Sequence, residues 1–173
     1  MEKLKILFIT SKFPRYLEDT QPRFVYNLAE ALKDLGHELH VVAPHDRGVK
    51  KEEVMNGINI YRFQYFYRAS LQIVSYGPGI PQNVNAGLIA KMQMPFFVLS
   101  EISMAKKISK KINPDIVHAH WALPQGMAAR ATKKPYVVTL YGGEVFLAKK
   151  FELVGFLDKV LREAGMAVTI TTG

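Results

Sequence analysis

The 173-residue sequence contains no cysteine, and it has no glycine in the segment that follows its first apolar run. Without cysteine, the chain has no disulfide framework and no cysteine-ligated zinc site. The first apolar run, residues 4–9, is too short to cross a bilayer and shows no cleavage-site pattern. These absences predict a cytoplasmic protein.

The composition is that of a folded protein with an excess of positive charge. Hydrophobic residues make up 49% and charged residues 22% of the chain, which lies outside the range of disordered sequences. The length suits one domain over residues 1–173. The net charge of +8 is compatible with nucleic acid, anionic lipid or a phosphorylated small molecule as a partner, and it does not choose among them.

Short apolar runs alternate with helical stretches along the whole chain, which is the pattern of a parallel sheet covered on both faces. The six predicted strands are residues 4–10, 39–43, 58–63, 115–119, 136–140 and 167–171. Because strand and helix alternate from the start, the sequence predicts a doubly wound α/β fold. Ligands of such folds bind at the carboxyl ends of the strands.

Two helical regions have a distinctive pattern. Residues 22–35 place five apolar residues on one helical stripe, namely Phe24, Val25, Leu28, Leu32 and Leu35. The pattern over residues 84–112 is helical but contains Pro95, which is expected to kink the helix or divide it in two.

The segment after the first strand lacks the glycines of a GxGxxG turn or a Walker-type phosphate loop. We therefore predict no nicotinamide or flavin bound in the usual way, and no cofactor. Asp19 and Thr20 are candidate caps of the following helix.

Three cations surround the same segment. Arg23 falls in the first turn of the predicted helix, where the helix dipole disfavours a cation unless an anion lies nearby. We predict that Lys12, Arg15 and Arg23 form an anion-attracting rim. An exposed arginine that tolerates its position is an equally good interpretation of Arg23.

Two histidines follow each other at the end of the fourth predicted strand. Residues two apart on a strand share a face, so His118 and His120 are expected to point the same way. We interpret His118 as structural, with its ring hydrogen-bonded to nearby backbone. His120 is expected just past the strand, in the ligand crevice, as a functional residue. A zinc site that adds Glu144 has no recognisable ligand spacing, so no metal is predicted.

The next strand ends in Tyr141-Gly142-Gly143-Glu144. Paired glycines let the backbone approach a ligand or adopt a positive φ, and a plain tight turn is the alternative. Glu144 is expected to cap or open the following helix.

Three segments carry a family resemblance. Residues 32–44 read LKDLGHELHVVAP, residues 114–126 read PDIVHAHWALPQG, and residues 134–144 read KPYVVTLYGGE. In order and spacing they are similar to the Gly-His, PDxVHaHwxxPxG and KPxVxTxHGxD elements of glycosyltransferase family 4. Tyr141 stands where that pattern has histidine, Glu144 where it has aspartate, and Asp19 and Thr20 where members often have two glycines.

The resemblance implies the N-terminal, Rossmann-like half of a retaining GT-B glycosyltransferase, with its donor-binding half absent from this chain. It implies metal-independent transfer from a nucleotide-sugar donor to a sugar or lipid-linked acceptor, and an isolated chain that is inactive. The catalytic candidate is His120, which matches the family's donor-sugar histidine. The candidate cleft-binding residues are Lys12, Arg15, Asp19, Thr20, Arg23, His118, Tyr141, Gly142, Gly143 and Glu144.

Other functions are compatible with parts of the sequence. The aromatic and basic run at residues 61–68 suits a nucleic-acid-binding module, although we expect it to continue a strand into a loop and expect no nucleic acid. A receiver or flavodoxin-like protein is disfavoured, because no acidic cluster follows the first predicted strand and no glycine-rich phosphate loop replaces it. A membrane-recruitment half, peripheral at the inner membrane face, is compatible with the glycosyltransferase interpretation.

Overall fold

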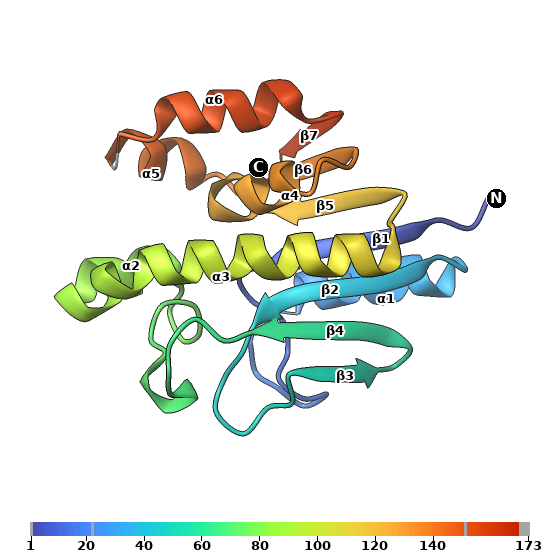
Figure 1. The fold of residues 1–173 in the computed structure, drawn as a ribbon, viewed down its shortest axis with the longest axis horizontal. Helices are drawn as coiled ribbons and strands as arrows, with labels where there is room; N and C mark the ends of the chain where they lie inside the picture. The colour runs from blue at the N-terminus through green and yellow to red at the C-terminus, as the bar shows by residue number, and fades with distance from the viewer. Residues whose placement is uncertain (1, 22, 151, 170–173) are drawn as a thin grey trace.

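The computed structural model describes residues 2–21, 23–150 and 152–169. Within these residues the chain forms one seven-stranded sheet with the order β3-β4-β2-β1-β5-β6-β7 (Figure 1). The strands are β1 (Lys5–Thr10), β2 (Glu38–Pro44), β3 (Glu52–Met55), β4 (Ile58–Phe63), β5 (Ile116–His120), β6 (Tyr136–Leu140) and β7 (Met166–Thr169). Neighbouring strands pair in parallel, except for the antiparallel pair β3 and β4.

The six predicted strands are confirmed, but the predicted end of the last one, residues 170–171, lies outside the described residues. Strand β3 was not predicted. It forms a hairpin with β4 through Asn56 and Gly57, whose φ angles are 46° and 80°. A two-residue Asn-Gly turn with both φ angles positive matches the twist of paired strands. The Asn-Gly pair was therefore the sequence signal for this hairpin.

Helices cover both faces of the sheet, as expected of a doubly wound fold. The helices are α1 (Phe24–Asp34), α2 (Ile80–Ala86), α3 (Leu88–Ile112), α4 (Met127–Ala131), α5 (Glu144–Lys150) and α6 (Val154–Glu163), with a 3-10 turn at Ala69–Leu71 and a π-helical turn at Ala122–Gly126. Alternate residues of β1 enter the two cores: Phe8 packs on the α1 side, and Leu7 on the side of α3 and α4.

The buried face of α1 differs from the predicted stripe. Two residues of the predicted stripe, Val25 and Leu32, pack in the core, together with Tyr26 and Ala29. The other three, Phe24, Leu28 and Leu35, are exposed. Tyr26 can occupy the core because its hydroxyl group donates a hydrogen bond to Glu30 at 3.0 Å and accepts one from the Asn56 side chain at 2.8 Å.

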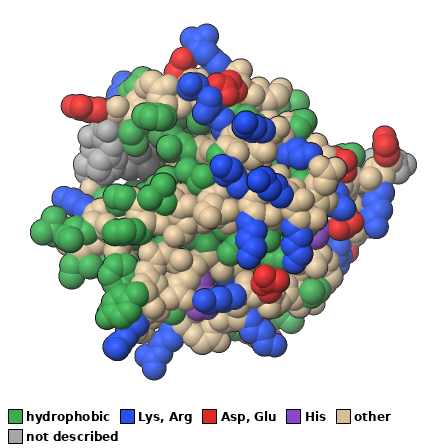
Figure 2. Space-filling view, in the orientation of Figure 1, with side chains coloured by type: hydrophobic (Ala, Val, Ile, Leu, Met, Phe, Trp, Pro, Cys, Tyr) green, Lys and Arg blue, Asp and Glu red, His purple; other side chains and the backbone are tan. Residues whose placement is uncertain are grey.

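The expected division at Pro95 was wrong, because α3 continues through Pro95 and the break lies earlier, at Gly87. Gly87 has an extended backbone that separates α2 from α3. Helix α3 is long and apolar enough to cross a membrane by length and composition. Its inner side packs on the sheet through Phe97, Ala105 and Ile108. Its outer side lies on the surface shown in Figure 2, where apolar side chains gather at one end and lysines at the other.

Candidate active site

The switch point of the sheet lies between β1 and β5. From β1 the chain builds β2 and β4 on one side, and it then crosses to β5 on the other side. A hollow of about 190 Å³ opens here, and its lining includes Thr10, Ser11 and Lys12 after β1 and Trp121 and Leu123 after β5. In open α/β sheets, ligands bind at this position. The hollow is therefore the candidate active site.

Lys12 is the cation of this hollow. Its Nζ atom donates a hydrogen bond to the carbonyl oxygen of Gly77 at 2.7 Å, and partial burial lowers its pKa. A Cβ atom added to Gly79, which has a φ of 115°, would lie 3.5 Å from the same Nζ atom. Residues 77–79 therefore contact the end of the Lys12 side chain and hold its ammonium group beside the hollow.

Trp121 contributes a strained backbone to the same hollow. Its φ of 92° lies in a region that non-glycine residues rarely adopt, at a cost of roughly 1–3 kcal/mol. Its backbone N–H donates to the carbonyl oxygen of Thr139 at 3.0 Å, and its ring stacks on Tyr141 with centroids 6.0 Å apart. The end of β6 therefore holds Trp121 in place. Because this strain depends on neighbouring strands, no local sequence pattern predicts it.

The two histidines share one face of β5, as predicted. Their rings stack with centroids 4.2 Å apart, and both lie edge-on to Phe8. The Nε2 atom of His118 lies 2.7 Å from Oγ1 of Thr139. Its partner is thus a side chain rather than the predicted backbone group, because β6 brings Thr139 beside it.

The predicted location of His120 needs correction. It is the last residue of β5 and is fully buried, rather than lying past the strand in an open crevice. The register pairs it with Thr10 of β1 and Thr139 of β6, so strands flank it on both sides.

The hydrogen bonding of His120 is one-sided. Its Nδ1 atom lies 2.9 Å from the hydroxyl oxygen of Tyr141, and its Nε2 atom has no hydrogen-bond partner among the described residues. Burial and the adjacent His118 hold the pKa of His120 well below its ordinary value, and burial lowers the pKa of His118 to about 4. Both rings are therefore neutral at pH 7. An unpartnered buried nitrogen costs roughly 1–3 kcal/mol and calls for an explanation.

The turn after β6 orients Tyr141. The Tyr141 backbone N–H donates to Oε1 of Glu144 at 2.8 Å, and Glu144 is buried at the start of α5, where it was predicted to open a helix. Gly142 has a φ of 93°, and the position of a Cβ on Gly143 would be 3.7 Å from the Trp121 ring. Burial, followed by the charge of Glu144, raises the pKa of Tyr141. Its phenol therefore stays protonated and can donate to His120.

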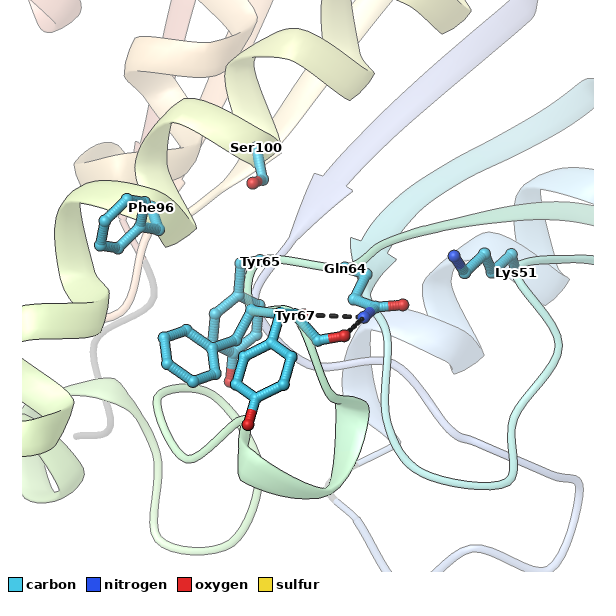
Figure 3. Close-up of a pocket in the computed structure, with 7 residues that line it drawn as sticks. Lys51, Gln64, Tyr65, Tyr67, Phe96 and Ser100 are labelled. Atoms are coloured by element: carbon cyan, nitrogen blue, oxygen red, sulfur yellow. Dashed lines mark hydrogen bonds between the residues drawn. The ribbon is translucent and has the colours of Figure 1, made fainter.

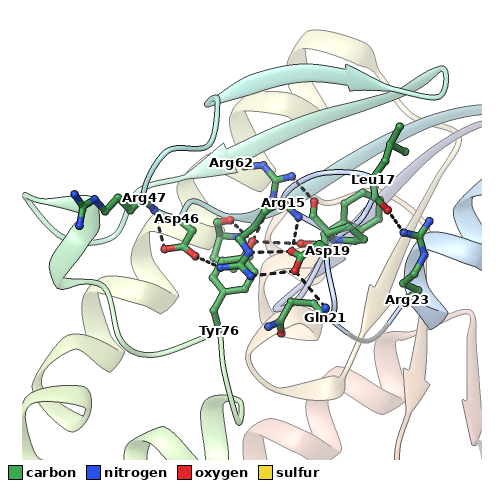
Figure 4. Close-up of polar contacts among 12 residues, drawn as sticks. Arg15, Leu17, Asp19, Gln21, Arg23, Asp46, Arg47, Arg62 and Tyr76 are labelled. Carbon is green, nitrogen blue, oxygen red and sulfur yellow. Dashed lines mark hydrogen bonds and ion pairs between the residues drawn. The ribbon is translucent and has the colours of Figure 1, made fainter.

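Asp19 does not cap α1. The N-cap position is Arg23, which makes no side-chain cap hydrogen bond. Asp19 is instead buried in ion pairs with Arg15, at 2.9 Å from its Nε atom, and Arg15 also reaches Asp46 at 3.0 Å (Figure 4). The hydrogen bonds from Arg15 lower the pKa of Asp19 to about 2. Thr20 is exposed.

The three cations of the predicted rim have different surroundings. Lys12 lines the candidate active site, whereas Arg15 lines a separate hollow of about 260 Å³ and has two carboxylates as partners. Arg23 lines neither hollow; its guanidinium lies 4.5 Å from the centre of the Tyr26 ring and donates to the Leu17 carbonyl oxygen. Local partners thus hold Arg15 and Arg23 in place, and anion attraction by the three cations together stays a prediction.

The aromatic and basic run at residues 61–68 is mostly internal. Arg62 is fully buried, with its guanidinium on Glu53 and on the carbonyl oxygen of Pro14. Tyr61, Phe63 and Tyr65 are also buried. These side chains are therefore not available to stack on bases or pair with phosphates.

Two further features lie outside the candidate active site. A hollow of about 580 Å³ is an open groove whose lining includes Tyr67, Phe96 and Lys51 (Figure 3). It contains none of the predicted site residues. In the part of the chain that the structure describes, no group of three His, Asp or Glu side chains is placed to hold a metal ion.

Comparisons with known proteins agree with this geometry. The pattern of Glycosyltransferase Family 4 matches residues 21–168. The chain is 28% identical over 162 residues to the putative teichuronic acid biosynthesis glycosyltransferase TuaC of Bacillus subtilis. The match covers 82% of this chain and 37% of TuaC.

Two solved structures show the same architecture. One is the glycosyltransferase SsfS6 of Streptomyces sp. SF2575 in complex with thymidine diphosphate, with a TM-score of 0.53, 18% identity, and coverage of 94% of this chain and 46% of that one. The other is MurG of Acinetobacter baumannii, with a TM-score of 0.51, 16% identity, and coverage of 99% and 42%. These are GT-B glycosyltransferases, so the predicted fold class is confirmed. The chain spans less than half the length of each relative.

Proposed function

Because the chain belongs to glycosyltransferase family 4, we propose that it is the acceptor-side half of a retaining enzyme that transfers a sugar from a nucleotide-sugar donor to a sugar or lipid-linked acceptor. The hollow at the switch point between β1 and β5 supports this assignment, because it lies where such a sheet binds ligands. The solved relative in complex with thymidine diphosphate supports a nucleotide-linked donor.

The observation that carries the proposal is the unpartnered Nε2 atom of His120. When the Tyr141 hydroxyl donates to Nδ1, the neutral ring carries its hydrogen on Nε2 and can donate it to a sugar oxygen. Because His120 is fully buried, its contact with a donor requires the side chains that cover it to move. Trp121 adjoins His120 in the sequence, has a strained backbone and lines the hollow, so we expect it to take part in this movement.

The catalytic contribution of His120 follows from where charge develops. In sugar transfer, positive charge grows on the ring and negative charge on the departing phosphate. A hydrogen bond that strengthens in the transition state lowers the barrier, whereas equal ground-state binding does not. Lys12 supplies a positive charge on the same side of the sheet for the departing phosphate or an anionic acceptor.

The donor is expected to be held mainly by a second Rossmann-like half, because the chain spans only 37% of its curated relative. We therefore expect the isolated 173-residue chain to fold and to show no turnover. The test combines the chain with a donor-binding half and supplies radiolabelled nucleotide sugars with saccharide or lipid-linked acceptors. Transfer with retained anomeric configuration supports the proposal. Inversion refutes the retaining mechanism, and turnover by the isolated chain refutes the need for a second half.

A further inference from the structure

The outer face of α3 has a mainly apolar half, which also contains the exposed Lys91, followed by a basic half. Its exposed apolar residues are Leu88, Ile89, Met92, Phe96 and Leu99, and its exposed lysines toward the other end are Lys106, Lys107, Lys110 and Lys111. Figure 2 shows the two groups side by side on one surface of the molecule. We call these nine residues the α3 outer face.

The residues form one stripe rather than a scatter. Leu88, Met92, Leu99, Lys106 and Lys110 are separated by four or seven positions, so they lie in line along the helix. At 1.5 Å per residue, the apolar half is about 16 Å long. Exposed apolar residues gathered on one surface in this way are typical of a contact surface.

The charge on this face has a single sign. The acidic residue within α3, Glu101, is fully buried and accepts a hydrogen bond from the Gln125 side chain at 3.0 Å. From the neighbouring strand β3, Glu52 approaches Lys111 at 3.8 Å, while no ion pair joins Lys106, Lys107 or Lys110 to another described residue. Three lysine charges are therefore left for an external anionic partner.

The groove beside the apolar half widens the surface. Phe96 belongs both to the α3 outer face and to the lining of the groove, which also includes Phe66 and the exposed Tyr67. Figure 3 shows Phe96 on the helix and Tyr67 on the loop across the groove. Leu71 and Ile73, from the same loop region, are also exposed. Aromatic side chains with one apolar and one polar end favour the boundary between lipid headgroups and acyl chains.

We propose that the α3 outer face docks on the surface of an anionic phospholipid bilayer. The apolar half enters the boundary between headgroups and acyl chains, and the lysines lie over anionic headgroups. The helix does not cross the bilayer, because Phe97, Ala105 and Ile108 bind its inner side to the sheet. This proposal stands whether or not the chain transfers sugar.

Docking in this way also orients the candidate active site. Helix α3 begins beside α2, at the edge of the sheet to which the strands β2 and β4 point (Figure 1). The residues that start α2, Ile80 to Gln82, line the hollow that contains Lys12. The apolar half of the α3 outer face is thus at the same end of the molecule as the hollow.

The test is sedimentation of the chain with vesicles of phosphatidylcholine alone and of phosphatidylcholine mixed with phosphatidylglycerol. The unmodified chain is expected to bind the mixed vesicles and to be released by salt. At about 1 kcal/mol per lysine, the double variant Lys106→Glu/Lys110→Glu should bind roughly 30-fold or more weakly. The matched control is Lys149→Glu/Lys159→Glu, which changes the net charge equally at exposed positions of α5 and α6 and should keep its binding.

The apolar half is tested by Phe96→Ser, with Phe156→Ser of α6 as its control, because both side chains are 54% exposed. Phe96→Ser is expected to weaken binding roughly tenfold, and Phe156→Ser should not. Equal losses in a variant and its control, binding independent of phosphatidylglycerol, or no binding by a folded chain would overturn the proposal. A stable dimer that Phe96→Ser dissociates would assign the face to a second copy instead. Thermal melts of each variant establish that it is folded.

Discussion

The Nδ1 atom of His120 and the hydroxyl oxygen of Tyr141 lie 2.9 Å apart and join the ends of two adjacent parallel strands. Tyr141 occupies a position where the family pattern has histidine. Because its phenol is protonated and half-buried, it sets which nitrogen of His120 carries the hydrogen. The substitution in the family pattern thus has a structural role in this chain.

His120→Ala is expected to reduce turnover of the complete enzyme on the order of a hundred- to a thousand-fold, the scale seen on removal of one transition-state donor. His120→Gln, whose amide can reach the position of Nε2, should recover part of that loss. The measurement is kcat together with a thermal melt. His45→Ala is the control, since His45 is also buried but lies after β2. An equal loss of turnover in both alanine variants would assign His120 to stability alone.

Tyr141→Phe removes the hydrogen bond to His120 and keeps the ring that packs on Trp121 and Phe24. We expect turnover to fall roughly tenfold, the free energy of unfolding to fall by about 1 kcal/mol, and the tautomer of His120 to change in nitrogen NMR spectra. Tyr136→Phe is the matched control, since it also loses one tyrosine hydrogen bond, the 2.7 Å bond to the Val160 carbonyl oxygen. It should lower stability without changing turnover per folded molecule. An unchanged tautomer in Tyr141→Phe would contradict the positioning role.

Asp19→Asn is expected to destabilise the domain by roughly 1–3 kcal/mol at pH 7, because it removes a buried partner of Arg15. The pKa of Asp19 is depressed to about 2 in the folded state, so its contribution is present above its ordinary pKa of 3.8 and is lost as pH falls toward 2. Chemical denaturation between pH 2 and 7 should show that the free energies of unfolding of the unmodified chain and of Asp19→Asn become equal at low pH. Asp158→Asn, from an exposed pair with Arg162, should change stability by less than about 1 kcal/mol at all pH values.

Glu101→Gln is expected to stabilise the domain at neutral pH by roughly 1–3 kcal/mol, because burial raises the pKa of Glu101 to about 8. Between its ordinary pKa of 4.5 and 8, the unfolded chain releases this proton and the folded chain keeps it. Stability is therefore lost as pH rises through that window. The variant keeps an acceptor for Gln125 and should show a smaller decline of the melting temperature from pH 5 to 8. A steeper decline than in the unmodified chain would contradict the assigned protonation.

Local sequence patterns were sufficient to predict most strands of the sheet. The strands β1, β2, β4, β5 and β6 are buried apolar runs, and such runs in alternation with helices leave few other arrangements. The exposed β3 was missed because its residues, Glu52 to Met55, have no apolar run. For α1 the period was right, and Val25 and Leu32 of the predicted stripe face the core, but the burial of Tyr26 was missed. Its second hydrogen-bond partner, Asn56, comes from the β3–β4 turn and lies beside it only in the folded chain.

The doubly wound fold, the family resemblance and the pairing of His118 with His120 on one face could all be predicted, because each depends on spacing along the chain. Which charges are free and which polar atoms lack partners depends instead on residues that meet only in the folded chain. Arg15 has two carboxylates and His120 has one hydrogen bond because residues up to 31 positions away meet them in space. The strain at Trp121 and the single-signed α3 outer face have the same origin, since both depend on which neighbours the folded sheet brings alongside.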